Sequence, residues 1–409
     1  MLSRRVFIKS GSVALLSLGF APSFLARAAE GATARKRLLI AIFQRGAVDG
    51  LNMVVPYGEA DYYALRPSIA IPRPGAADGG IDLDGFFALH PRMSGLKPLW
   101  DNGSLAIVHA CGSPDVTRSH FDAQDYMETA TPGVKSTRDG WLNRYLQATG
   151  AETSPLRGVA VARQMPRSLQ GRAPTLAVGN IESFDVRGGM AAERQLEDAF
   201  ADSSSSLLSG NAKAAFEAMR TLRQAGGGSY QPAAGVDYPR SPFGQALQEI
   251  ARVAKADVGL EIAFAEASNW DHHVAEGGTQ GQIAQRLDDF SRGLAALAAD
   301  LGERLADTVI LTMSEFGRAV AENGNRGTDH GHGNAMLLIG GPVKGRSVYG
   351  RWPGLGAPQR FEGRDLAVTT DFRDVFAEVA TRHLSLTSEA VARVFPRYTV
   401  GTTLGIIRA

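Results

Sequence analysis

Short, continuous runs of apolar residues recur along the chain, and each predicts a buried strand. An unbroken run of four to eight apolar residues is typical of a parallel strand that is covered on both faces. The predicted strands are residues 38–43, 105–110, 176–178, 261–265, 307–312 and 335–339.

Helical periodicity fills the intervals between these runs. It is strongest over residues 280–305, where Ile, Leu and Phe recur three and four positions apart. Thr279 with Gln282 has the pattern of a capping box. Further helices are predicted at 93–100, 119–129, 142–148, 192–223, 243–254 and 372–383. Strands alternating with helices predict an α/β fold with a mostly parallel sheet. Residues 163–239, rich in Gly, Ser and Pro, are interpreted as a helical and loop insertion.

The first 28 residues have the pattern of an export signal. Arg4 and Arg5 are followed by an apolar stretch over residues 13–20 and by a small-residue site at Ala26-Arg27-Ala28. The sequence therefore predicts a twin-arginine signal peptide at 1–28 and a single domain at 29–409. The export machinery would carry the chain, already folded, to the periplasm or beyond. An uncleaved anchor is the alternative, but the apolar stretch falls short of the roughly 20 residues that span a bilayer.

Composition narrows the class of protein without naming a function. The 409 residues are 44% hydrophobic and 21% charged, with a net charge of +1. So balanced a charge argues against a nucleic acid or an anionic membrane as the main partner. We expect no stable membrane span after cleavage, because no later stretch is long and apolar enough. One cysteine, Cys111, excludes an internal disulfide.

Metal-ligand residue types gather in short motifs near the predicted strand ends. Because the carboxyl ends of parallel strands meet at one edge of a sheet, these loops are expected to converge there. Carboxylates and imidazoles together suit one or two divalent ions, Zn²⁺, Mn²⁺, Mg²⁺ or Ca²⁺. Each motif has an alternative as an ordinary polar turn or helix cap. The candidate ligands are Asp49, Asp271, His273, Glu315, Asp329, His330 and His332.

A hydroxyl nucleophile is the second candidate feature. Ser119 opens a predicted helix, where free backbone N–H groups favour an anion, and Arg118 lies beside it. Ser119 would attack phosphorus or sulfur; its alternative role is a simple N-cap, and Thr117 is an alternative nucleophile. Arg45, Arg118 and Arg318 are candidates to hold substrate oxygens, unless they are solvated surface charges.

Taken together, the motifs resemble those of the domain-of-unknown-function 1501 family, exported bacterial proteins of the alkaline phosphatase-like superfamily. The matching segments are 45–52, 117–122, 270–273, 312–318 and 327–333. The resemblance implies a three-layer α/β/α sandwich, usually with two metals. It matches Asp49 to the Asp after the first strand, Ser119 to the nucleophile, Asp271 and His273 to an Asp/His pair, and His332 to a final ligand.

Two departures from the superfamily pattern bear on function. Ser314-Glu315 stands where an Asp-His pair is usual, and Asp329-His330 is the candidate replacement. The formylglycine motif of sulfatases is not found around Cys111 or Ser119. The sequence predicts an exported metal-dependent hydrolase of phosphate or sulfate esters, acting on a small-molecule or carbohydrate ester. The alternative is a metal-stabilised periplasmic binding or assembly protein without turnover.

Overall fold

A computed structural model describes residues 15–16, 37–150, 154–179, 217–218, 220–221, 230–401 and 403–408. The proposed signal peptide and its cleavage site lie outside these residues, apart from Leu15–Leu16 (β1). So do most of the predicted helix at 192–223 and much of the insertion predicted at 163–239. Within the described residues, no helix has the length and apolar character needed to cross a bilayer.

A central sheet organises the described part of the chain. Its strands lie in the order β1-β8-β7-β9-β2-β10-β11-β6-β12, and β13 also pairs with β6. β8, β7, β9, β2 and β10 are successively parallel, whereas β11 is antiparallel to both of its neighbours. The strands after β1 are Leu38–Gln44 (β2), Leu105–Gly112 (β6), Gly158–Val161 (β7), Leu176–Val178 (β8), Ile262–Ala267 (β9), Thr308–Met313 (β10), Asn334–Ile339 (β11), Ser347–Tyr349 (β12) and Thr370–Asp371 (β13).

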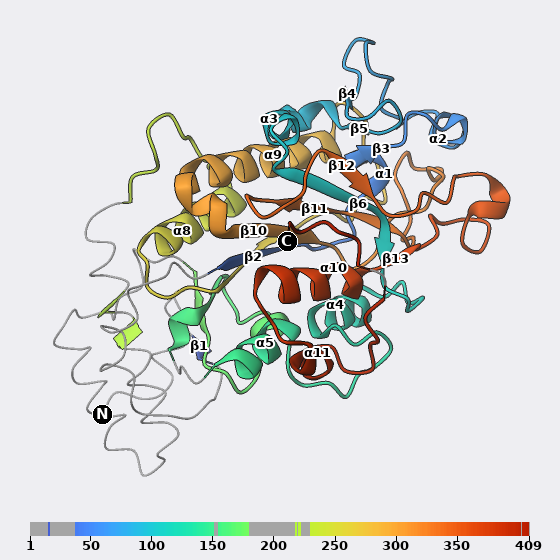
Figure 1. The fold of residues 1–409 in the computed structure, drawn as a ribbon. Helices are drawn as coiled ribbons and strands as arrows, with labels where there is room; N and C mark the ends of the chain where they lie inside the picture. The colour runs from blue at the N-terminus through green and yellow to red at the C-terminus, as the bar shows by residue number, and fades with distance from the viewer. Residues whose placement is uncertain are drawn as a thin grey trace, which may run out of the picture.

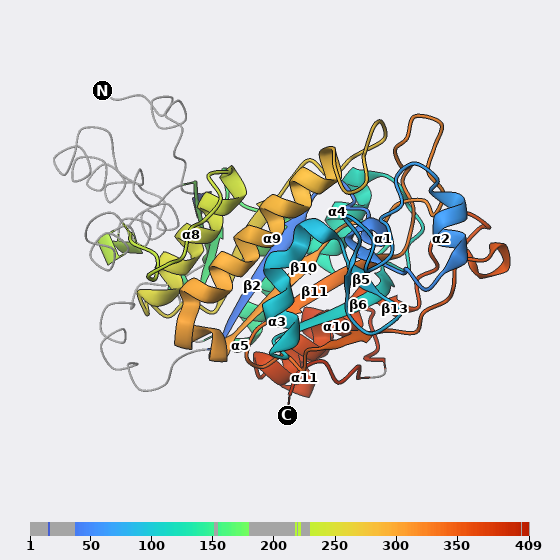
Figure 2. The same cartoon turned by 90° about the horizontal axis from the view of Figure 1, so that it is seen from above.

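Both faces of this sheet are covered by helices. Alternate residues of β2 enter different cores: Leu38, Ile40 and Ile42 pack into one, and Leu39, Ala41 and Phe43 into the other. Figure 1 shows α8 (Pro242–Lys255), α9 (Gln282–Leu301) and α3 (Lys97–Asp101) on one side of the sheet. On the other side lie α4 (His120–Thr129), α5 (Trp141–Thr149), α10 (Phe372–Glu378) and α11 (Ser388–Val394). Figure 2 shows α8 and α9 side by side across the first face. The predicted α/β/α sandwich with a mostly parallel sheet is confirmed.

All six predicted strands are present, with ends that differ by two residues at most. The sequence did not reveal β7, because four small and branched residues carry too short a pattern. It also missed a separate three-stranded sheet, formed by Val54–Val55 (β3), Ile81–Asp82 (β4) and Ala88–Leu89 (β5). Two short helices, Gly50–Met53 (α1) and Ala60–Leu65 (α2), lie in the same region.

The start of α9 differs from the prediction. The helix begins at Gln282 and its N-cap is Gly281, whose φ of 97° is accessible to glycine, so the predicted capping box of Thr279 and Gln282 is wrong. The Gln282 side chain instead donates to the carbonyls of Val274 and Ala275, each at 2.9 Å. These bonds tie the start of α9 to the loop that follows β9.

Strand direction decides which loops meet. β2, β9, β10 and β6 point their carboxyl ends to one edge of the sheet. Since β11 runs the opposite way, the residues that precede it lie at that same edge. The loops after β2, β6, β9 and β10 therefore converge with the loop before β11.

Candidate metal centre

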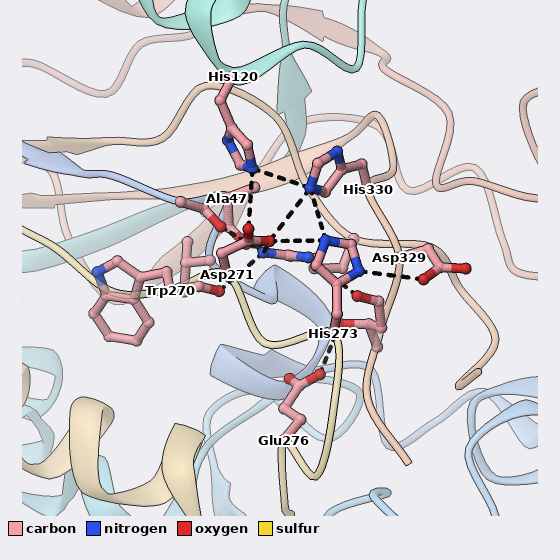
Figure 3. A network of polar contacts seen from close by, with 12 residues as sticks. Ala47, His120, Trp270, Asp271, His273, Glu276, Asp329 and His330 are labelled. Carbon is pink, nitrogen blue, oxygen red and sulfur yellow. Dashed lines mark hydrogen bonds and ion pairs between the residues drawn. The ribbon is translucent and has the colours of Figure 1, made fainter. Parts of the chain in front are cut away.

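Three side chains from three of these loops converge on one point. The group comprises His120, Asp271 and His330, whose ligand atoms all lie within 4.8 Å of one another. Nε2 of His120 is 3.0 Å from Nε2 of His330, and Asp271 places Oδ1 3.3 Å from His330 and Oδ2 3.5 Å from His120. Figure 3 shows the three side chains pointing toward one another. In the part of the chain that the structure describes, no group of His, Cys, Asp or Glu outside this cluster and its neighbour His273 meets this spacing.

The other nitrogen of each imidazole faces a hydrogen-bond acceptor. Nδ1 of His120 lies 2.8 Å from Oε1 of Glu315, and Nδ1 of His330 lies 2.9 Å from the carbonyl oxygen of Arg118. A carboxylate and a carbonyl can only accept, so in each ring Nδ1 carries the hydrogen. Both Nε2 atoms then direct lone pairs at each other across 3.0 Å. Two lone pairs and a carboxylate oxygen aimed at one point offer a cation three ligand atoms.

The spacing fits a first-row divalent ion. Ligand atoms around a tetrahedral zinc, with bonds of about 2.0–2.1 Å, stand about 3.3 Å apart. The separations here are 3.0, 3.3 and 3.5 Å. The hydrogen bonds to Nδ1 are those that ordinarily orient metal-binding histidines. The residues present therefore fit a metal, held by His120, Asp271 and His330.

His273 stands beside this group. Its Nε2 is 2.9 Å from Nε2 of His330 and 3.0 Å from Oδ1 of Asp271, and its Nδ1 is 3.3 Å from Oδ1 of Asp329. The side chains of His273 and Asp271 are 40% and 45% exposed, so this side of the centre is open to solvent. Among the residues described, His273 is thus placed either to complete the metal shell or to exchange a proton with a molecule bound there.

Buried Arg318 fixes the carboxylate of the group. Its guanidinium donates to Oδ1 of Asp271 at 2.7 Å and to backbone carbonyls of Ala47, Thr328 and Trp270 at 2.6, 3.0 and 3.0 Å. Burial alone would raise the pKa of Asp271, but the hydrogen bond and charge of Arg318 lower it to about 2. Asp271 is therefore an anion at neutral pH. Because its donors are occupied by the protein, Arg318 orients the site, contrary to the expectation that it holds substrate.

An aromatic side chain packs against two of the imidazoles. The ring centroid of Phe316 is 5.0 Å from that of His120 and 5.1 Å from that of His330, and Phe316 forms a small apolar cluster with Ala47 and Ala123. Gly46 lets the loop after β2 approach the loop after β9. Its φ is +113°, and a Cβ there would lie 2.9 Å from the backbone nitrogen of Asp271.

Glu315 and Asp329 lie behind the imidazoles rather than at the point of convergence. Buried Glu315 accepts from the backbone N–H of Gly46 and from the side chain of Gln124, each at 2.8 Å, besides its contact with His120. Burial would raise its pKa, but these hydrogen bonds lower it, so Glu315 stays a carboxylate. The structure thus places both predicted ligands where they orient His120 and His273.

Asp49 is not brought to the centre. It caps α1 by accepting from the N–H of Leu51 at 3.2 Å, and its carboxylate forms a buried ion pair with Arg66. Burial alone would raise the pKa of Asp49, but the charge and hydrogen bond of Arg66 hold it below its usual value. Buried Glu276 also contacts Asp49, and its pKa is raised well above the usual range by burial and by the Asp49 charge. A fixed cation already neutralises Asp49, so the predicted ligand role does not fit it.

The remaining candidates take separate places. His332 is buried and stacks on Phe361 with 4.5 Å between ring centroids, away from the convergent group, and burial lowers its pKa. Arg45 pairs with Glu128 and Glu266 at 2.8 and 2.6 Å, which ties α4 to β9 instead of leaving the guanidinium free for substrate.

The helix start at Ser119 has the predicted form. Ser119 is exposed and is the N-cap of α4, but its side chain makes no capping hydrogen bond. Thr117 accepts the N–H of Ser119 through Oγ1 at 3.2 Å. Arg118 pairs with buried Asp365 at 2.6 Å and with Glu362 at 2.7 Å. His120, the first residue of α4, was visible in this motif but was not among the predicted ligands; its signal was its place at a strand-end loop among the other histidines.

Comparisons with known proteins give a family and distant structural similarities. A search of curated proteins returned no match. The zinc complex of the C-terminal periplasmic domain of EcEptC from Escherichia coli has 9% identity over 76% of this chain and 74% of that one, with a TM-score of 0.35. A mutant of the alkaline phosphatase PafA has 9% identity over 70% and 64%, with a TM-score of 0.34. The sulfatase PsFucS1 from Pseudoalteromonas sp. has 12% identity over 94% and 75%, with a TM-score of 0.35. At such scores these likenesses say nothing about chemistry.

The family model is the stronger finding. It matches residues 103–395, a segment that contains His120, Asp271, His273 and His330. The chain belongs to the DUF1501 family, described as a protein of unknown function.

Proposed function

We propose that this protein is a metal-dependent hydrolase of phosphate or sulfate esters, with a single metal centre at His120, Asp271 and His330. The observation that supports it is the pair of Nε2 lone pairs that face each other beside the Asp271 carboxylate. Two imidazoles and a carboxylate favour Zn²⁺ or Mn²⁺ over Mg²⁺ and Ca²⁺, which prefer oxygen ligands. When bound, such an ion polarises an ester oxygen as a Lewis acid.

Three protein ligands are the number usual in catalytic zinc sites. In this proposal His273 stays outside the shell and faces the open side. Asp329 holds its Nδ1 at 3.3 Å, and Asp271 lies 3.0 Å from its Nε2. A histidine placed between two carboxylates is suited to giving a proton to the departing alcohol.

Ser119 is the proposed nucleophile. It is exposed, directly precedes His120, and has a hydroxyl that makes no capping bond. Thr117 is less suited, because its Oγ1 already accepts the N–H of Ser119. The Ser119 oxygen would bond to phosphorus or sulfur, and its proton would pass to solvent water, as the P–O or S–O bond to the alcohol breaks. A water molecule would then hydrolyse the serine ester and restore the Ser119 hydroxyl. The first-turn N–H groups of α4 would receive the negative oxygens.

The test combines metal analysis with a panel of aryl phosphates and aryl sulfates. The proposal predicts about one ion per chain, turnover on at least one ester, and loss of that turnover in Ser119→Ala with the metal retained. Val400→Ser is a matched control, since Val400 is exposed and lies near Thr381 and Arg382, not near the centre. Turnover that survives Ser119→Ala would exclude a serine nucleophile.

A binding or assembly protein is the second candidate, and the position of His273 is the observation that favours it. If His273 joins the other three residues, the shell closes with four protein ligands, as in structural zinc sites. His273→Ala separates the two. A catalytic proton donor leaves the metal in place and costs about 10²–10⁴-fold in rate when removed. A fourth structural ligand instead takes the metal with it.

We further propose export of the folded chain by the twin-arginine route to the periplasm or beyond. The support is the Arg4-Arg5 pattern, together with a centre whose residues span positions 120 to 330 and meet only after folding. Loading before transit would fix the choice of metal. Replacing Arg4 and Arg5 by lysine should leave the protein in the cytoplasm. Export of the double-lysine variant at the wild-type level would contradict this route.

A further inference from the structure

Exposed large apolar side chains are concentrated in the two segments that carry His120 and His273. In the described residues, four such side chains stand out: Val116 at 54%, Phe121 at 91%, Val274 at 58% and Val400 at 52% exposed. Three of the four lie within four positions of His120 or His273. Single exposed apolar residues are normal on a protein surface. Their concentration beside one polar centre is what needs a reason.

The chain itself fixes how close two of them are. Phe121 directly follows His120, and Val274 directly follows His273. Consecutive Cα atoms are about 3.8 Å apart, so each apolar residue stands next to a residue of the centre. His120 and His273 both reach Nε2 of His330, at 3.0 and 2.9 Å, from different elements. The two apolar residues therefore each lie one position from a residue of the centre, one in α4 and one in the loop after β9.

Local structure gives no internal reason for these exposures. Phe121 lies in the first turn of α4, whose buried residues begin at Ala123. Val274 lies in the loop that Gln282 holds through the Val274 carbonyl at 2.9 Å. Neither position needs an apolar side chain to form its element. Water contact on a phenyl ring is unfavourable, and an apolar group bound at the centre would relieve it.

We propose that Phe121, with Val274 and Val116, contacts the alcohol portion of the ester, and that this portion is aromatic or aliphatic. The proposal rests on the hydrolase function above and narrows its substrate class. A highly hydroxylated alcohol such as a sugar needs polar partners, whereas Val274 and Val116 offer none. The preferred substrate is therefore a phosphate or sulfate ester of an apolar alcohol.

Binding of phosphonates to the zinc-loaded, full-length protein tests this without any need for turnover. Phenylphosphonate and methylphosphonate share the anionic group and differ in the apolar one. Calorimetry should show tighter binding of the phenyl compound. Phe121→Ser should lower the phenyl-to-methyl affinity ratio by about 3- to 10-fold, the range of one lost aromatic contact. Val400→Ser, the matched exposed control, should leave the ratio unchanged. Zinc content should be the same in all three proteins.

The results distinguish a failure of the apolar contact from a failure of the proposed hydrolase function. If Phe121→Ser leaves the ratio unchanged while ester turnover persists, the apolar contact is refuted and the hydrolase stands. If neither phosphonate binds and no ester is turned over, the hydrolase itself fails and the inference falls with it. A sugar phosphate that binds more tightly than phenylphosphonate would overturn the apolar class. So would an unchanged ratio with Phe121-dependent binding to phosphatidylglycerol vesicles, which would assign these residues to a membrane surface.

Discussion

Two groups of charged and polar side chains lie at the same edge of the central sheet and differ in how their negative charge is balanced. In one, Asp49 is buried against Arg66, a cation that the protein itself supplies. In the other, His120 and His330 direct lone pairs at each other beside the Asp271 carboxylate. The first group is neutralised internally and needs no ion. In the described part of the chain, the second has no such internal cation at its point of convergence, which makes it the candidate metal centre.

Removing one imidazole should have the largest effect on metal binding. His330→Ala deletes the nitrogen that both His120 and His273 face. We expect no metal at a concentration that saturates the wild type, measured by elemental analysis after gel filtration. Asp49→Asn is the matched variant from the other group and should keep the wild-type ratio of metal to folded protein. Metal retained by His330→Ala would place the ion elsewhere.

Asp49→Asn should act on stability instead. It leaves Arg66 buried without its counter-charge, and breaking a buried pair in this way costs about 3–5 kcal/mol of unfolding free energy. Chemical denaturation of chelator-treated protein measures the change without a contribution from metal. If Asp49→Asn lost its metal and yet unfolded like the wild type, Asp49 would be a metal ligand after all.

Removing a carboxylate that orients a ligand histidine should lower the metal affinity of the centre without abolishing metal binding. Glu315→Gln alters the acceptor at Nδ1 of His120, and partners of this kind are worth about 10- to 100-fold in metal affinity. Asp329→Asn is the companion variant and should have a smaller effect, because Asp329 is exposed and His273 is the only histidine of the site that it contacts. Competition with a chromogenic chelator gives both affinities. Equal losses of affinity would mean that the exposed carboxylate matters as much as the buried one.

The smallest effect that we expect is on the pH dependence of the unfolding free energy, through Glu276. Its pKa is raised in the folded state by burial and by Asp49, so the folded protein holds a proton that the unfolded chain releases. Its stabilising contribution is present below the unfolded pKa, about 4.3, and declines as pH rises toward the folded pKa, by at most about 1.4 kcal/mol per unit. Glu276→Gln should flatten that decline in chelator-treated protein. An unchanged slope would show that Glu276 keeps its ordinary pKa.

Much of the fold was predictable because the strands are continuous apolar runs with long amphipathic helices between them. β7 and the three-stranded sheet were not, since strands of two to four residues carry too little periodicity. The convergence of the loops also followed from strand direction. The antiparallel β11 was not foreseen, yet it is why a motif that precedes a strand meets motifs that follow strands.

The sequence did not predict the role of a residue when that role depends on a partner that is distant along the chain. Asp271, His273 and His330 were predicted as ligands and lie together. Asp49 has the same residue type and loop position, but Arg66 neutralises it from a helix end that no motif marks. Glu315 faces the back of His120, which the spacing of residues along the chain does not reveal.

X-ray absorption at the edge of the bound metal, on protein purified after folding in the cytoplasm, tests the central claim most directly. The account predicts one ion per chain with two imidazole nitrogens in its shell and oxygen completing it. In His120→Ala, one imidazole should disappear from any ion that remains, and His273→Ala should leave the spectrum unchanged. Two ions per chain, or a shell of oxygen alone, would contradict a centre built on His120, Asp271 and His330.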